Sequence, residues 1–145
     1  MGIKRKMLTA ILSLMEFRPF RGRTGPEDRI AMDIALMLRA ATLSGKLSAT
    51  WTHVPHEIGG RGIQAAIRVA LAKAMGLIGG SGDYVFVAPE GGGWIEVKVP
   101  GNYPSPSQKN FRLWCEHAGV KYALCRSVQE VEETLIEWGF LRTSR

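Results

Sequence analysis

Cysteine and long apolar runs are scarce in this chain of 145 residues, and each scarcity argues against a class of protein. The two cysteines, Cys115 and Cys125, are too far apart for a metal knuckle, and there is no second pair. Lone cysteines in apolar surroundings are usually buried, reduced thiols, so we expect a cytoplasmic protein rather than a disulfide-stapled secreted one. No run approaches the roughly 18 consecutive apolar residues of a membrane-spanning helix, so we expect no membrane partner.

Acidic residues are also few relative to basic ones. The chain has 13 aspartates and glutamates against 19 lysines and arginines, which gives a formal net charge of +6. A basic excess favours a polyanionic partner such as nucleic acid, although many small basic proteins bind nothing anionic. The length corresponds to about one domain, and the composition is ordinary for a globular protein.

The chain divides into a basic arm at residues 1–25, with one or two helical turns, and a folded domain at residues 26–145. Apolar periodicity predicts four helices and four strands in the domain. Their order, helix, strand, helix, two strands of a hairpin, helix, strand, helix, indicates an α/β fold. In the helix expected at residues 63–75, the spacing predicts that Ile67, Leu71 and Ala74 face inward and that Arg68 and Lys73 face outward.

Three charged residues around the central hairpin form the most informative pattern. Alternate residues of a strand point to the same side, so Glu96 and Lys98 point together. The hairpin can bring Asp83, at the start of the neighbouring strand, beside Glu96. Adjacent carboxylates repel and are costly to bury, and a hard divalent cation such as Mg²⁺ or Mn²⁺ removes that cost. The alternative is a solvent-facing Glu–Lys pair that contributes under about 1 kcal/mol.

Such a site has the parts needed for phosphodiester hydrolysis. The metal can bind a phosphate oxygen as a Lewis acid and lower the pKa of a bound water. Lys98 could orient or deprotonate that water, or neutralise charge in the transition state.

The stretch from His53 to about Leu141 resembles the VRR-NUC domain, a branch of the PD-(D/E)XK nuclease superfamily. Members typically show Gly-Val-Pro-Asp, Glu-x-Lys and Ser-x-x-Gln in that order. Here the three motifs are Gly80 to Asp83, Glu96 to Lys98, and Ser105 to Gln108. Ser81 and Gly82 replace the Val-Pro step, which changes the bend before Asp83 but keeps its carboxylate.

The resemblance implies a restriction-endonuclease-like core, with a small mixed β-sheet flanked by helices and the metal site at a sheet edge. It implies that Asp83 and Glu96 bind the metal and that Lys98 is the catalytic lysine. The backbone carbonyl of Val97 would add a metal ligand. Glu27 resembles the first-helix glutamate that often completes the site, whereas its spacing alone favours a role at the helix dipole.

Gln108 resembles the helix glutamine of the family and is counted among the catalytic residues. Gln108, Phe111 and Cys115 share one helical face, so the amide is expected to point inward. A buried glutamine could instead be a purely structural hydrogen bonder.

Several polar residues around the expected site are candidates for DNA contact. His53 and Glu57 resemble a family turn that lines the site or contacts DNA, although a polar strand end is nearly as good an interpretation. Four basic residues could contact phosphates, or could simply be solvated: Arg61, Arg68, Lys73 and Lys109.

The function that we expect is an Mg²⁺-dependent or Mn²⁺-dependent endonuclease that cuts DNA. Stand-alone members of this branch resemble junction resolvases, which suggests branched DNA such as a Holliday junction as substrate. A homodimer is expected because two active sites are needed to cut a branched DNA symmetrically. So compact a form suits a bacterium or a phage-infected host. The alternatives are a DNA-binding module, a subunit of a replication or packaging machine with little catalysis, or a structural protein.

Overall fold

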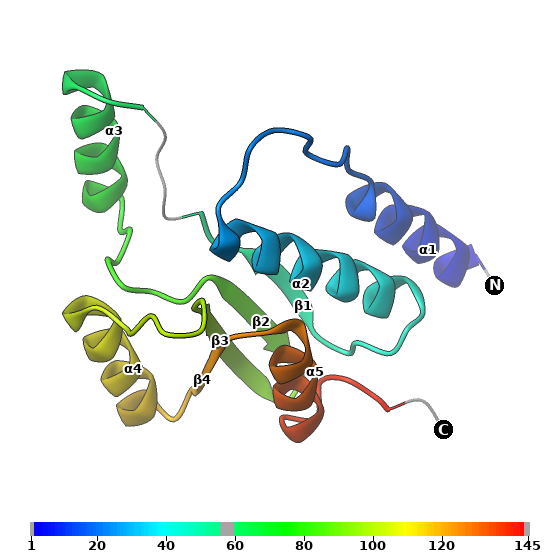
Figure 1. Cartoon of the computed structure of the whole chain (residues 1–145). Helices are drawn as coiled ribbons and strands as arrows, with labels where there is room; N and C mark the ends of the chain where they lie inside the picture. The colour runs from blue at the N-terminus through cyan, green and yellow to red at the C-terminus, as the bar shows by residue number, and fades with distance from the viewer. Residues whose placement is uncertain (1, 56–59, 144–145) are drawn as a thin grey trace.

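The computed structural model describes residues 2–55 and 60–143, and this part of the chain contains five helices and four strands (Figure 1). In chain order they are α1 (Gly2–Met15), α2 (Pro26–Leu43), β1 (Thr50–His53), α3 (Ile63–Ala74), β2 (Tyr84–Ala88), β3 (Gly91–Val97), α4 (Pro106–Ala118), β4 (Lys121–Cys125) and α5 (Val128–Glu137).

The four strands form one mixed sheet in the order β1-β2-β3-β4. β1, β2 and β3 are antiparallel neighbours, and β4 is parallel to β3. A parallel pair cannot be joined by a tight turn, so α4 makes the crossover between β3 and β4. The expected α/β fold with a small mixed sheet flanked by helices is therefore confirmed.

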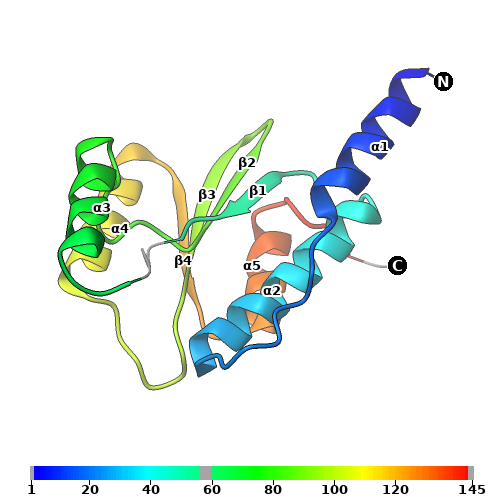
Figure 2. The ribbon, with the colours of Figure 1, turned by 90° about the horizontal axis from the view of Figure 1, so that it is seen from above.

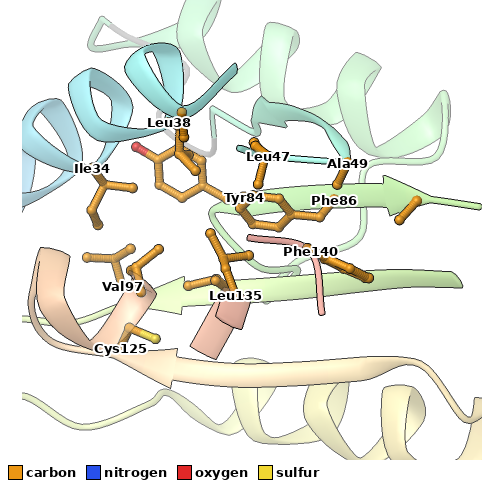
Figure 3. Close-up of a cluster of buried hydrophobic side chains, with 14 residues drawn as sticks. Ile34, Leu38, Leu47, Ala49, Tyr84, Phe86, Val97, Cys125, Leu135 and Phe140 are labelled. Carbon is orange, nitrogen blue, oxygen red and sulfur yellow. The ribbon is translucent and has the colours of Figure 1, made fainter. Parts of the chain in front are cut away.

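The main core lies between the sheet and the helices α2 and α5, which cover the same face (Figures 2 and 3). Ile34 and Leu38 lie four residues apart on α2, so both side chains reach the sheet, where they are buried with Phe86. Leu135 of α5 and Cys125 of β4 close the same cluster (Figure 3). α4 covers the opposite face of the sheet through Phe111 and Cys115.

Gly93, near the start of β3, permits close packing of Trp138, the residue that follows α5. A Cβ atom on Gly93 would lie 2.5 Å from the ring of Trp138, just beyond α5. Only a glycine leaves room for the indole against the strand at this position, because real Cβ atoms do not approach other atoms so closely. The residue after α5 therefore packs directly on β3.

The N-terminal arm is more helical than its sequence suggested. α1 has 14 residues and packs on α2, instead of forming one or two turns. The segment that follows is fixed to α2 as well, because the Arg39 guanidinium lies 3.9 Å from the centre of the Phe17 ring. None of the described helices is both long enough and apolar enough to cross a membrane.

The inward face of α3 was predicted wrongly. Ile67 and Leu71 are more than half exposed, and Ala74 is exposed, whereas the side of α3 that is turned toward the protein carries Ala65 and Val69. Figures 1 and 2 show that α3 stands away from the sheet, on the same side of it as α4, which agrees with the exposure of its larger side chains.

We expect Phe86→Ala to lower the free energy of unfolding by about 3–5 kcal/mol, because it removes a fully buried ring from the centre of the core. Val87→Ala, on the same strand but 59% exposed, should change stability by no more than about 0.5 kcal/mol. Urea denaturation of both variants measures the difference, and equal losses would contradict the core described above.

Candidate active site

Glu96 is the one carboxylate that the structure buries in the described part of the chain, with 1% of its surface exposed. It lies on β3 between Ile95 and Val97, which point into the main core. Strand alternation directs Glu96 to the opposite face of the sheet, toward α4. A buried charge is costly unless it is paired, hydrogen-bonded or bound to a metal, so the surroundings of Glu96 identify its role.

Two side chains contact one oxygen of Glu96, and the other oxygen has no partner. Gln108 Nε2 donates a hydrogen bond to Glu96 Oε1 at 2.7 Å, and Lys98 Nζ lies 3.9 Å from the same oxygen. Glu96 Oε2 is buried and has no hydrogen-bond partner among the described residues. Buried polar atoms are nearly always satisfied, so an orphaned carboxylate oxygen is a candidate acceptor for a cation or a hydrogen-bond donor.

Asp83 is held next to this pair by the hairpin. The Val97 N–H donates to Asp83 Oδ2 at 2.6 Å, and the Asp83 N–H donates to the Ile95 carbonyl at 2.9 Å. Both bonds cross from the segment before β2 to β3, so the Asp83 carboxylate has a defined position. The expectation that the hairpin brings Asp83 and Glu96 together is confirmed.

The glycine-rich bend before Asp83 lets this segment approach the first turn of α4. Gly80 has φ +88°, and a Cβ atom there would lie 2.4 Å from the backbone of Ser107. A Cβ atom on Gly82 would lie 3.2 Å from Trp94 and from the Ile95 carbonyl. The close approach at Gly80 brings the aspartate and the start of α4 to the same place.

The start of α4 orients Gln108. Ser105 and Gln108 form a capping box, in which the Gln108 N–H donates to Ser105 Oγ at 3.3 Å and the Ser105 N–H donates to Gln108 Oε1 at 2.8 Å. Because the amide oxygen is used by the cap, the amide nitrogen is directed at Glu96. Gln108 is therefore both a structural hydrogen bonder and a site residue, and the two interpretations of its sequence position do not exclude each other.

The carboxylates disfavour each other's charge. Burial and, next, the negative charge of Asp83 raise the pKa of Glu96 to about 8, although the positive charge of Lys98 opposes the shift. The negative charge of Glu27 adds a smaller increase. Without a cation, Glu96 therefore retains its proton to a much higher pH than an exposed glutamate.

A pocket of about 380 Å³ opens onto this cluster. α2 contributes Glu27 to its wall, and the Tyr84 hydroxyl holds that part of the helix by donating to the Ala31 carbonyl at 2.9 Å. Seven of the residues singled out from the sequence line the pocket: Glu27, His53, Lys73, Asp83, Glu96, Val97 and Gln108.

The other predicted residues lie elsewhere. Lys98 reaches the cluster from the side, through its contact with Glu96. Arg61, Arg68 and Lys109 are exposed and do not line the described pocket. Glu57 lies outside the residues that the structure describes.

Sequence reasoning missed part of the pocket wall. Asp28 and Ser107 line the pocket but were not singled out. The signal for each was its position beside a predicted site residue, because Asp28 follows Glu27 in the first turn of α2 and Ser107 lies inside the Ser-x-x-Gln motif.

Asp83 and Glu96 lie side by side without a third carboxylate, histidine or cysteine grouped with them in the described part of the chain. Within residues 2–55 and 60–143, no three histidine, cysteine, aspartate or glutamate side chains are grouped closely enough to hold a metal ion. Glu27 lines the same pocket and its charge raises the pKa of Glu96, so it faces the two carboxylates from α2.

Comparison with known proteins adds a structural likeness. No family model and no curated protein matches the chain. Among solved structures, the chain is similar to one described as a "VRR_NUC domain protein", with a TM-score of 0.48 and 17% sequence identity over 94% of this chain and 85% of that chain. At this level of similarity, the assignment of a function depends on the site itself.

In EDTA, we expect the stability of the protein to fall as the pH rises from about 5 to about 8. The folded state keeps a proton on Glu96 up to about pH 8, whereas the unfolded chain releases it near its ordinary pKa of 4.5. The folded state thus binds more protons in this window, and its advantage is lost as the pH passes through 8. Thermal unfolding of Glu96→Gln, which cannot titrate, should depend less on pH. Identical pH profiles for the two proteins would contradict the raised pKa.

Proposed function

We propose that this protein is a metal-dependent endonuclease that hydrolyses DNA phosphodiester bonds. The observation that carries the proposal is the buried carboxylate of Glu96, with one oxygen unpartnered, beside Asp83 and in contact with Lys98 and Gln108. A solvent-facing Glu–Lys pair, which was the structural alternative, does not fit a glutamate that is 1% exposed.

The site suits Mg²⁺ or Mn²⁺ as cofactor. Asp83 and Glu96 supply the hard oxygen donors that these ions prefer, and Glu96 Oε2 is an acceptor that lacks a partner among the described residues. The Val97 carbonyl and Glu27 would complete the ligand set. When bound, the ion would act as a Lewis acid on a phosphate oxygen and lower the pKa of a coordinated water.

Gln108 and Lys98 have different roles in this proposal: the first orients a carboxylate and the second neutralises charge on the substrate. Gln108 fixes the orientation of Glu96 through Oε1, which leaves Oε2 directed elsewhere. In hydrolysis, a water oxygen forms a bond to phosphorus, the bond from phosphorus to one sugar oxygen breaks, and that oxygen takes up a proton. Lys98, an ammonium next to Glu96, would neutralise charge that develops on the phosphate during this exchange.

DNA is the polyanion that suits the charge of the chain. The net charge of +6 favours contact with a phosphate backbone. Lys73 and His53 line the pocket and would contact DNA next to the cleaved bond, whereas Arg61, Arg68 and Lys109 would contact phosphates farther away.

We propose branched DNA such as a Holliday junction as the substrate and a homodimer as the active form. The surface of α3 supports a second copy as partner. Ile63, Ile67, Leu71 and Met75 follow each other at intervals of four residues, lie on one side of the helix, and are all more than half exposed. Such an apolar stripe is typical of a protein interface.

Cleavage of labelled DNA tests the enzyme directly. We expect the wild type to cut a four-way junction in Mg²⁺ or Mn²⁺ and not in EDTA, and to cut linear duplex and single strands more slowly. Lys98→Ala should lower the rate at least about 100-fold, because it removes a charge that acts on the transition state. Lys121→Ala, which removes the same charge from the exposed start of β4, is the matched control and should retain activity.

A second readout separates a metal site from a structural carboxylate. Mg²⁺ should raise the melting temperature of the wild type but not that of Glu96→Gln. Binding of DNA without cleavage in every metal would contradict the enzyme, and would favour a DNA-binding module or a subunit of a larger machine.

Light scattering on a sizing column tests the homodimer. We expect a dimer for the wild type and a monomer for Leu71→Glu, because a charge in a buried apolar contact is costly. Val87→Glu, at a hairpin position with a similar exposed fraction, should remain dimeric. A monomeric wild type at the concentrations used for cleavage would contradict this part of the proposal.

A further inference from the structure

The loop between Lys98 and α4 begins with a tight turn. The Asn102 N–H donates to the Val99 carbonyl at 3.0 Å, which closes a turn with Pro100 and Gly101 at its centre. Gly101 has φ +91°, as the third residue of a type II turn requires, and Pro100 suits the second position. This part of the loop therefore has one preferred conformation.

Arg126 fastens the turn to the sheet. Its Nη1 donates to the Val99 carbonyl at 2.9 Å and to the Asn102 carbonyl at 2.6 Å. Arg126 itself directly follows β4, and its backbone N–H donates to Glu130 Oε2 at 2.6 Å. A single half-buried guanidinium thus connects both ends of the turn to a rigid part of the fold.

The turn is followed by Tyr103, an aromatic side chain that is 80% exposed. The carbon of the Arg126 guanidinium lies 5.9 Å from the centre of the Tyr103 ring, and Pro104 limits the backbone on the other side. An exposed tyrosine is common on a mobile loop. Here the backbone before it is hydrogen-bonded and the ring lies beside a cation, so little freedom remains to be lost when a ligand covers the ring.

In the sequence, Tyr103 is flanked on both sides by residues of the proposed site. Ser105, two residues later, lines the pocket, and Lys98, which contacts Glu96, begins the same loop. Tyr103 therefore lies in the segment that connects Lys98 to the pocket wall at Ser105.

We propose that Tyr103 is a stacking platform for an unpaired nucleobase next to the cleaved phosphate, and that Arg126 is the positioning residue that holds it there. The inference rests on the proposed nuclease function. A base within a duplex has both faces covered by its neighbours, whereas a base at a fork or branch exposes a face that an aromatic ring can cover. The platform would therefore recognise the structure of the DNA and tolerate any sequence.

Binding of two labelled DNA molecules tests the platform without cleavage. The probes are a fork with single-stranded arms and a duplex of the same sequence, each titrated with the full chain by fluorescence anisotropy, with Ca²⁺ in place of Mg²⁺. We expect Tyr103→Ala to weaken fork binding roughly five- to one-hundred-fold, the range that loss of one stacked base produces. Binding of the duplex should not change.

Matched variants separate stacking from apolar contact. Tyr103→Phe and Tyr103→Trp keep an aromatic face and should retain fork binding, whereas Tyr103→Leu keeps an apolar side chain and should behave like Tyr103→Ala. All four substitutions are at an exposed position, so equal melting temperatures are expected.

Arg126 is tested through its coupling to Tyr103. If Arg126 acts by holding the ring, the single substitution Arg126→Ala should lower the affinity for the fork. The same substitution added to Tyr103→Ala should have little further effect on that affinity. A purely structural effect would be additive in the double variant, and would overturn the positioning role.

The outcomes for the platform and for the nuclease are distinct. A wild type that binds the fork and a Tyr103→Ala variant that binds it equally well would overturn the platform and leave the nuclease proposal intact. A wild type that binds neither DNA would overturn both. Loss of fork binding in Tyr103→Ala and its retention in Tyr103→Phe would support the platform.

Discussion

The contact between Gln108 and Glu96 is the interaction around which the rest of the site is arranged. It joins two elements that lie on either side of a loop, β3 and α4, and it directs one carboxylate oxygen away from the helix. The capping box at Ser105 orients the amide, and the tight approach at Gly80 places the first turn of α4 against the bend before Asp83. Secondary structure and site geometry here depend on the same hydrogen bonds.

Much of this arrangement follows from local sequence rules. The two-residue period of β3 predicted that Glu96 and Lys98 point together, and the hairpin predicted that Asp83 joins them. Helical spacing predicted the inward direction of Gln108. Each inference used residues close together in the chain, where the geometry of a strand or helix leaves few choices. The order of the elements indicated the α/β class, whereas the small mixed sheet was implied by the resemblance of the motifs to a known family.

The features that could not be predicted depend on contacts between elements that are far apart in the sequence. The direction of α3 was wrong because apolar periodicity shows which residues share a face and not whether anything covers that face. Ile67 and Leu71 satisfy the pattern of a buried stripe but lie on a helix that stands away from the sheet. The role of Arg126 was equally hidden, since its partners Val99 and Asn102 are backbone carbonyls, which carry no sequence signal.

The parallel pairing of β3 with β4 has a consequence for the order in which the protein can assemble. Asp83 and Glu96 belong to a hairpin, a local structure that forms on the microsecond timescale. Lys98 is fixed by a hydrogen bond from its N–H to the Cys125 carbonyl, and Arg126 follows at the end of the same strand. Because α4 separates the two strands in the chain, that pairing closes a longer loop and is slower. The hairpin alone is enough to bring the carboxylates together, whereas the hydrogen bonds that hold Lys98 and the turn at Val99 require β4 to be in place.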